Sequence, residues 1–375
     1  MHRALVLGAL LCRVAAGAPL GVVVYHNASE GYHTFRLPTL AVTPSHLLMF
    51  AEGRARDGFA PPAGDTKDCF GEGASAADWR CTNKDVVLKR SADGGRTWGA
   101  ARALALATEA YFYTNPQPLY DAARGAVWLL YMRCAAVAGG GNAFLNCTTV
   151  LSSSTDAGAT FGAPADVGPA QTSSGGFGGL VTAAGRLIFA APSNAKTGCL
   201  FSDDGGATWA WGAPPTPGGG ENSIAELADG ALLMTARHKN NTRSLARSAN
   251  GGATWAPNAL MNVTDPDCQA SLLAVATPAD ARPLLFANPH TSGLLPYATG
   301  RQNVTVQVSH DGGASFSPLL LVDDGPSAYT ALAQLAPAGA GPRSCGVAYE
   351  ESADLPVDFR SIRFVAFDCA TGAVE

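Results

Sequence analysis

The sequence predicts an all-β protein built as a six-bladed β-propeller, and three observations carry this prediction. A box of the form Ser-x-Asp/Asn-x-Gly-x-Thr/Ser-Trp/Phe begins at Ser91, Ser154, Ser202, Ser248 and Ser309. Repeats at this spacing are typical of propellers and solenoids. The 375 residues include 43 Gly and 24 Pro, which favours short strands joined by turns. The segments between the boxes, such as "DVVLKRS", "AVWLLYM", "NVTVQVS" and "IRFVAFD", alternate like strands, which excludes helical repeats.

Each box is predicted to be a hairpin turn that recurs once per blade. Asp, Asn and Gly suit a turn with side-chain to backbone bonds and positive φ, and the closing Trp or Phe can tuck its ring beneath it. The box aspartates are therefore expected to form turns and not to carry chemistry. Five boxes suit six blades of about 60 residues, since terminal repeats tend to be irregular. We expect "GVVVYHN" at residues 21–27 to complete the sheet that contains "IRFVAFD" at residues 362–368.

The first residues predict a secretory signal. Residues 1–18 combine a basic start, an apolar run over residues 4–12 and small residues around a cleavage site near Ala16. The alternative is a buried first strand. Residues 19–375 then form one domain, because no linker or composition shift divides them. No later run approaches the ~20 apolar residues of a membrane-spanning helix, so no membrane span is expected.

The cysteines and sequons also indicate an oxidising compartment. Without Cys12, eight of the nine cysteines remain. Proximity in sequence suggests the pairs Cys69–Cys81, Cys134–Cys147 and Cys345–Cys369, which leaves Cys199 and Cys268. Asn-x-Ser/Thr sequons lie at Asn27, Asn146, Asn240, Asn262 and Asn303. We expect a secreted or lumenal protein, either extracellular or in a lysosome-like compartment.

Charge and motif content exclude several functional classes. A net charge of −5 gives no long-range attraction for nucleic acid or an anionic membrane. The seven His and the scattered Asp show no metal-ligand spacing, so neither a metal nor another cofactor is expected. The Gly-rich stretch "GGFGG" at residues 175–179 lacks the Lys-Ser/Thr end of a phosphate-binding loop.

The residues between the boxes narrow the function. They include "TFRLP" at residues 34–38, "FAEGR" at 50–54 and "GGGENSIAELADGALLMTAR" at 218–237. Further on come "GRQNVTVQVSHDGG" at 300–313, "PSAYTALAQL" at 326–335 and "GVAYEE" at 346–351. In content and order these segments resemble the motifs of the exo-α-sialidase (neuraminidase) family with Asp-box repeats, along nearly the whole chain after the signal. By the same resemblance, "GGFGG" is read as the loop near the glycerol or acetamido side of the sugar.

The resemblance implies a role for each residue in these segments. Arg36, Arg237 and Arg301 would hold the substrate carboxylate by charge-assisted hydrogen bonds, and Glu350 would position Arg36. Arg54 would line the pocket. Tyr329 would be the nucleophile and Glu221 its base, because a neutral phenol is not repelled by the substrate carboxylate as an acid would be. Taken singly, each residue is more often a surface or packing residue; their joint order favours a site.

A general acid is also required, and the resemblance places it on the loop between "EGR" and the first box. That loop offers Asp57, Asp65, Asp68, Asp78 and Asp85. Asp78 is preferred because it lies 13 residues before Ser91, close to the offset that the resemblance implies. Asp65, which lies in a Gly-Asp context but 26 residues before Ser91, is second. A Cys69–Cys81 bond would hold Asp78 in a short loop. Asp85 is expected to begin the strand that leads into the box.

The sequence therefore predicts an exo-α-sialidase that removes terminal sialic acid with retention, through a tyrosyl intermediate. Its partners would be sialylated glycans on glycoproteins, glycolipids such as gangliosides, or oligosaccharides. One alternative is a trans-sialidase, which passes the sugar to another glycan. The other is a catalytically silent sialic-acid-binding lectin that retains the arginines.

Overall fold

The described part of the chain consists of strands and their connections. The computed structural model describes residues 20–57, 83–135, 147–168, 178–191, 198–214, 220–238, 241–257, 259–277, 282–291, 300–335, 344–353 and 359–374. Within these ranges every regular element is a β-strand, which confirms the all-β prediction. No helix in them is long and apolar enough to cross a membrane. The predicted signal at residues 1–18 lies outside the described residues.

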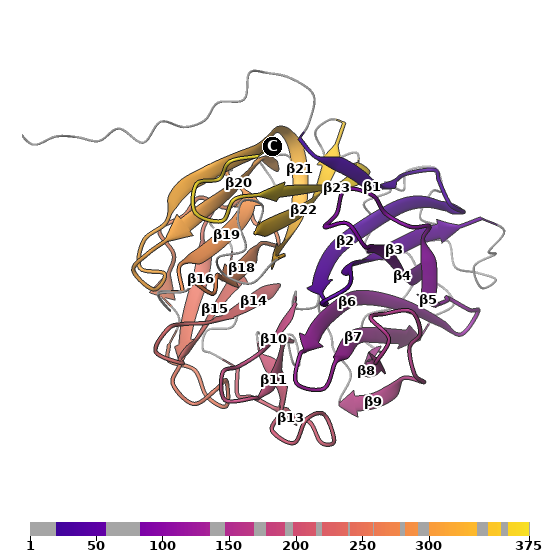
Figure 1. Ribbon diagram of the computed structural model, residues 1–375, viewed down its shortest axis with the longest axis horizontal. Helices are drawn as coiled ribbons and strands as arrows, with labels where there is room; N and C mark the ends of the chain where they lie inside the picture. The colour runs from indigo at the N-terminus through magenta and orange to yellow at the C-terminus, as the bar shows by residue number, and fades with distance from the viewer. Residues whose placement is uncertain are drawn as a thin grey trace, which may run out of the picture.

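Four sheets each contain four strands that are consecutive in the chain and antiparallel. The first two sheets contain β2 (Tyr32–Val42), β3 (Leu47–Arg56), β4 (Lys84–Ser91) and β5 (Arg102–Ala105), then β6 (Tyr111–Asp121), β7 (Ala126–Ala135), β8 (Cys147–Ser154) and β9 (Ala165–Gly168). The next two contain β10 (Gly179–Val181), β11 (Leu187–Ala190), β12 (Cys199–Ser202) and β13 (Ala210–Trp211), then β14 (Asn222–Glu226), β15 (Leu232–Arg237), β16 (Arg243–Ser248) and β17 (Ala259–Leu260). The sheets follow one another around a common centre, which gives a propeller-like arrangement (Figure 1).

The fifth sheet has seven strands because one long strand changes partner. It contains β18 (Ser271–Ala274), β19 (Leu284–Pro289), β20 (Gln302–Ser309), β21 (Ser317–Gln334), β22 (Cys345–Ser352), β23 (Phe359–Phe367) and β1 (Val22–His26). The first half of β21 pairs with β20 up to Pro326, and the second half pairs with β22 from Ser327. Strand β1 pairs with β23, so the prediction that residues 21–27 complete the last sheet is confirmed.

The five boxes form the same turn after β4, β8, β12, β16 and β20. In the third box the Ser202 hydroxyl accepts the Gly206 N–H at 2.8 Å, and Asp204 accepts the Thr208 N–H at 2.8 Å. Gly206 has φ 94°, a conformation that suits glycine. The Trp209 indole donates to the Gly206 carbonyl at 3.1 Å, so the ring lies under the turn. The prediction that the boxes are scaffold turns is confirmed.

Apolar clusters between neighbouring sheets hold the ring together. Phe50 and Leu88 of one sheet pack in one cluster with Val127 and Leu129 of the next. The first and last sheets meet in the same way, since Phe35 shares a cluster with Phe364. This packing between sheets fixes the strands nearest the centre relative to one another.

Two of the predicted disulfides are present. Cys134 is bonded to Cys147 and Cys345 to Cys369. The predicted Cys69–Cys81 pair lies outside the described residues. Cys199 and Cys268 are free and buried, and burial raises the pKa of both thiols to about 12. Both are therefore neutral thiols at ordinary pH and not candidate nucleophiles.

Candidate active site

Six residues from three sheets form one connected set of contacts, and we call them the central cluster. They are Arg36, Glu221, Arg237, Arg301, Tyr329 and Glu350. Arg36 belongs to β2, Tyr329 to β21 and Glu350 to β22, whereas Glu221 and Arg301 come directly before β14 and β20. Arg237 is the last residue of β15. The structure thus brings together the six residues that the motifs placed in a substrate and nucleophile site.

Arg36 and Glu350 form a buried bidentate ion pair. Arg36 Nε lies 2.7 Å from Glu350 Oε1, and its second terminal nitrogen lies 2.9 Å from Oε2. Glu350 also accepts the main-chain N–H groups of Leu37 at 2.8 Å and Tyr329 at 3.2 Å. Leu37 has φ 58°, an unusual value for leucine, at the bulge that follows Arg36 in β2. Glu350 therefore fixes Arg36 and connects its strand to that of Tyr329.

Aromatic rings complete the surroundings of Arg36. The centre of its guanidinium lies 3.6 Å from the Phe359 ring centroid and 5.1 Å from that of Tyr329. Such contacts favour a planar, delocalised cation. They hold the Arg36 guanidinium beside the Tyr329 ring.

Tyr329 donates its hydroxyl hydrogen bond to Oε1 of Glu221. Burial, and then the Glu221 carboxylate, raise the pKa of Tyr329 well above its ordinary value, although Arg237 and Arg301 act in the opposite direction. The phenol is therefore neutral at ordinary pH, and the group that can take its proton is already in contact with it. This pair can generate a nucleophile at the moment of reaction.

Arg237 and Arg301 both contact Asp267, a residue that no motif had indicated. Arg237 makes one ion pair with Glu221 at 3.0 Å and a second, through Nε, with Asp267 Oδ1 at 2.6 Å. Arg301 donates to the main-chain carbonyl of Asp267 at 2.9 Å. One residue thus contacts two of the three arginines.

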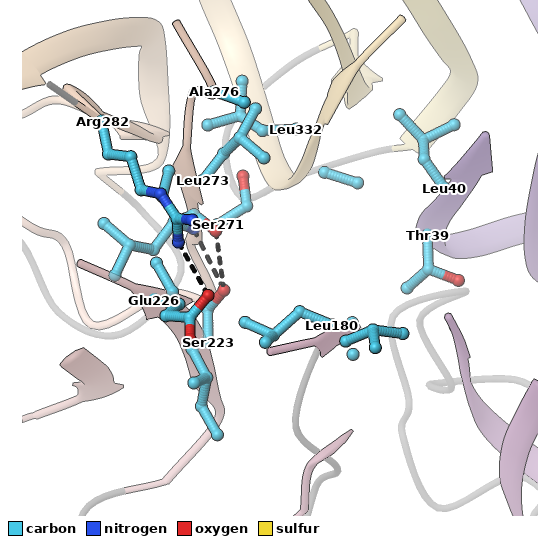
Figure 2. Close-up of a pocket in the computed structure, with 18 of the residues that line it drawn as sticks. Thr39, Leu40, Leu180, Ser223, Glu226, Ser271, Leu273, Ala276, Arg282 and Leu332 are labelled. Atoms are coloured by element: carbon cyan, nitrogen blue, oxygen red, sulfur yellow. Dashed lines mark hydrogen bonds and ion pairs between the residues drawn. The ribbon is translucent and has the colours of Figure 1, made fainter. Parts of the chain in front are cut away.

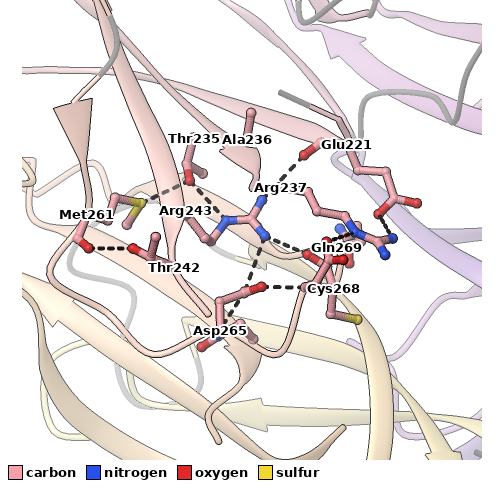
Figure 3. A network of polar contacts seen from close by, with 12 residues as sticks. Glu221, Thr235, Ala236, Arg237, Thr242, Arg243, Met261, Asp265, Cys268 and Gln269 are labelled. Atoms are coloured by element: carbon pink, nitrogen blue, oxygen red, sulfur yellow. Dashed lines mark hydrogen bonds and ion pairs between the residues drawn. The ribbon is translucent and has the colours of Figure 1, made fainter. Parts of the chain in front are cut away.

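A fully buried arginine, also missed from the sequence, supports this region. Figure 3 shows Arg243 pointing toward the turn at residues 265–268. One of its terminal nitrogens lies 3.2 Å from Asp265 Oδ2 and 2.6 Å from the Cys268 carbonyl oxygen, and the other lies 3.4 Å from the Glu221 carbonyl oxygen. Arg243 therefore connects the turn to the main chain of Glu221.

Arg54 has a buried acidic partner that the motifs did not indicate. It is buried, and both Nε and one terminal nitrogen contact Glu52 Oε2, at 2.9 and 2.6 Å. Burial raises the pKa of Glu52, but Arg54 and Lys84 outweigh this effect and lower it to about 2. In the strand register Glu52 lies opposite Arg36. The described contacts of Arg54 thus support the strand beside Arg36, and its role in lining the pocket stays a prediction.

The candidate general acids are less fully placed. Asp78, Asp65 and Asp68 lie outside the described residues. Asp85 is in β4, as expected, and accepts hydrogen bonds from Tyr32 at 2.7 Å, Arg56 at 2.8 Å and the Ala107 N–H at 2.6 Å. With three donors on a buried carboxylate, Asp85 has a structural role.

A cavity of about 340 Å³ is lined by residues of strands β2, β10, β14, β18 and β21 (Figure 2). Its wall includes Ser223, Ser271 and Thr330, and a 2.7 Å ion pair between Glu226 and Arg282 crosses one side. None of the six central-cluster residues lines it. Among the described residues, no group of three or more His, Cys, Asp or Glu is arranged to hold a metal ion. We place the candidate site at the central cluster because three arginines, two glutamates and a tyrosine contact one another there.

Comparison with known proteins identifies the family of the chain. Residues 78–340 match the BNR repeat-like domain family, and the chain belongs to that family. It is 28% identical to a sialidase of Bacteroides fragilis and 27% identical to a sialidase of Micromonospora viridifaciens, over 89% and 88% of its length. It spans 63% and 54% of those two proteins.

Similar solved structures support the fold. The Hadza microbial sialidase Hz136 superposes with a TM-score of 0.73 at 23% identity, over 92% of this chain and 68% of that one. A mutant of Trypanosoma rangeli sialidase displaying trans-sialidase activity gives 0.66 at 18% identity, over 91% and 56%. At these identities the likeness concerns the fold.

Proposed function

We propose that the chain is an exo-α-sialidase, a glycoside hydrolase that releases terminal sialic acid from glycoproteins, glycolipids or oligosaccharides. One observation carries the proposal: the Tyr329 hydroxyl donates to Glu221 beside Arg36, Arg237 and Arg301. A tyrosine with a carboxylate base suits attack on an anomeric carbon that bears a carboxylate. The similarity to curated sialidases along most of the chain supports this assignment.

The proposal includes a six-bladed propeller. Strand β21 leaves β20 and joins β22 at residues 326–327, so the seven-stranded sheet divides into two blades of four strands that share β21. Counting this sheet as two blades, together with the four other sheets, supports the proposed six blades. The central strands of different blades then supply Arg36, Glu221 and Tyr329.

The arginines bind the substrate carboxylate in this proposal. Arg36 is oriented by Glu350, and Arg237 by Glu221 and Asp267. Guanidinium groups recognise carboxylates by charge-assisted, often bidentate hydrogen bonds. The site can thus attract an anion although the chain carries a net charge of −5.

The reaction proceeds in two displacements. As the Tyr329 oxygen attacks the anomeric carbon, Glu221 takes the phenol proton. The bond to the leaving oxygen breaks, and that oxygen receives a proton from Asp78, with Asp65 as the second choice. Asp78 then takes a proton from water, the water oxygen attacks the same carbon, and Tyr329 leaves and recovers its proton from Glu221. Two inversions give net retention.

A fluorogenic aryl α-sialoside tests the proposal. The chain from residue 19 should release the fluorophore, and Tyr329→Phe should reduce kcat by at least about 10³-fold, because the phenyl ring has no nucleophilic oxygen. Turnover by Tyr329→Phe near the parent rate would overturn the assignment. Binding of sialic acid by the parent without turnover would favour the lectin alternative, and transfer to an added glycan in place of water would favour a trans-sialidase.

We also propose a secreted or lumenal location. The two disulfides suit an oxidising compartment, and the sequon residue Asn262 is exposed. Expression through a secretory pathway, followed by N-terminal sequencing of the product, tests this location. A mature chain beginning near residue 17 to 19 is expected, and retention of Met1 would contradict it.

A further inference from the structure

Asp267 lies in the turn between β17 and β18 and has an uncommon backbone conformation. Its φ is 55°, in the left-handed region that Gly, Asn and Asp adopt most readily. In this conformation its carboxylate contacts Arg237 Nε at 2.6 Å while its main-chain carbonyl accepts from Arg301 at 2.9 Å. One residue therefore bridges an arginine from β15 and an arginine directly before β20.

Buried contacts hold the turn that contains Asp267. Asp265 Oδ1 accepts the Cys268 N–H at 3.0 Å, and the buried Arg243 contacts both Asp265 and the Cys268 carbonyl (Figure 3). Arg243, Asp265 and Cys268 are each fully buried, whereas the Asp267 side chain is 29% exposed. A rigid base with one partly exposed acid suits a positioning role.

The contacts of Arg237 show what is positioned. Glu221 holds one terminal nitrogen at 3.0 Å and Asp267 holds Nε, so two carboxylates fix the guanidinium. Glu221 is also the acceptor for Tyr329. Without Asp267, Arg237 would have one fewer restraint on its orientation while the Glu221–Tyr329 hydrogen bond would remain.

We propose that Asp267 is a positioning residue of the site, which sets the orientation of Arg237 and its spacing from Arg301 for binding a carboxylate. This inference rests on the proposed function, because the carboxylate is that of sialic acid. In the proposed reaction Asp267 takes part in no proton transfer. Its removal should therefore weaken substrate binding more than it slows the chemical step.

Two substitutions separate position from charge. Asp267→Gly keeps the backbone conformation, and hence the carbonyl contact with Arg301, but removes the side chain. Asp267→Asn also tolerates positive φ and keeps an oxygen acceptor for Arg237 without the negative charge. Asp229→Gly is the matched control, because Asp229 also pairs with an arginine, Arg247, but is 59% exposed and lies outside the central cluster.

KM and kcat for the aryl α-sialoside, and the Kd of free N-acetylneuraminic acid by calorimetry, are measured for parent and variants. Asp267→Gly should raise KM and Kd about tenfold, the effect of losing one charge-assisted hydrogen bond, with kcat within about threefold of the parent. Asp267→Asn and Asp229→Gly should stay within about twofold in KM and Kd. A purely structural role would instead lower the active fraction, and so kcat, at constant KM.

The outcomes distinguish the two proposals. If the parent binds and turns over sialosides but Asp267→Gly keeps the parent KM and Kd, the inference is wrong and the proposed function stands. Equal increases for Asp267→Gly and Asp267→Asn would also overturn it, because charge and not position would then matter. A parent that neither binds nor hydrolyses sialosides would overturn both.

Discussion

The box turns and the central cluster both surround a carboxylate with donors, but they recruit those donors differently. Asp204 in the third box receives its hydrogen bonds from Ser202 and Thr208, within four residues along the chain. Glu350 receives its bonds from Arg36, Leu37 and Tyr329, of which the first two lie more than 300 residues away. The box can form wherever its sequence occurs, whereas the cluster forms only when the sheets have packed.

The same difference separates their electrostatics. Asp204 is exposed, and hydrogen bonds from Thr208 and Ser202 lower its pKa below the ordinary range. Glu350 and Glu221 are buried among arginines. Breaking a buried pair leaves an uncompensated charge away from water, whereas water replaces a lost partner at the surface. Substitutions in the two regions should therefore differ in kind as well as in size.

Beyond the loss expected for Tyr329→Phe, the largest effect on rate is expected from Glu221→Gln. The amide keeps the shape of the side chain but cannot take the Tyr329 proton, so kcat should fall by about 10²- to 10⁴-fold. Glu226→Gln is the control, because Glu226 lies on the adjoining strand β14 but pairs with Arg282 beside the cavity. It should keep kcat within about threefold of the parent. Glu221→Gln with more than a tenth of the parent kcat would remove Glu221 from the mechanism.

A large effect on stability is expected from Glu350→Ala. It leaves the buried Arg36 without its acid and two main-chain N–H groups without their acceptor. Breaking a buried pair in this way costs about 3 to 5 kcal/mol of unfolding free energy, which urea titration can measure. Glu351→Ala is the neighbouring control, since Glu351 is partly exposed and its ion pair with Arg363 is longer, at 3.4 Å. Equal losses of unfolding free energy for the two variants would show that Glu350 stabilises the fold no more than Glu351 does.

The smallest effects are expected in the boxes. Asp204→Asn converts the third box to the form of the fourth, where Asn250 accepts the Thr254 N–H at 2.9 Å and donates to its hydroxyl at 2.8 Å. It should leave the melting temperature nearly unchanged, whereas Asp204→Ala removes the acceptor and should lower it. Neither variant should change kcat/KM.

The pH dependence provides a check on the Asp204→Ala result. The folded-state pKa of Asp204 is below its ordinary 3.8, so the carboxylate stabilises the fold above that pH and the contribution is lost as the pH falls below it. The difference in melting temperature between parent and Asp204→Ala should therefore shrink in acid. A constant difference would assign it to packing instead of the carboxylate.

What the sequence predicted follows the same division. The boxes were predictable because their donors and acceptors are local, and the six residues of the central cluster because each lies in a distinctive segment. Asp267 and Arg243 were not predictable, since each acts through partners 22 to 34 residues away and neither belongs to a repeated motif. The continuity of β21 was also hidden, because its Asp-Asp-Gly-Pro stretch has the composition of a turn although the strand changes partner there. The ion pair between Arg54 and Glu52 was not predicted, because the sequence does not show that both side chains are buried.

The most direct test of the central claim is to trap the sugar on the enzyme. A 3-fluorinated sialosyl fluoride carries a good leaving group, and its ring fluorine slows breakdown of a glycosyl-enzyme. After incubation with the chain, intact mass followed by peptide mapping should show one adduct, on the peptide that contains Tyr329, and none in Tyr329→Phe. An active chain that carries the adduct on another residue, or that turns over this reagent with no adduct at any time, would contradict the assignment of Tyr329 as the nucleophile.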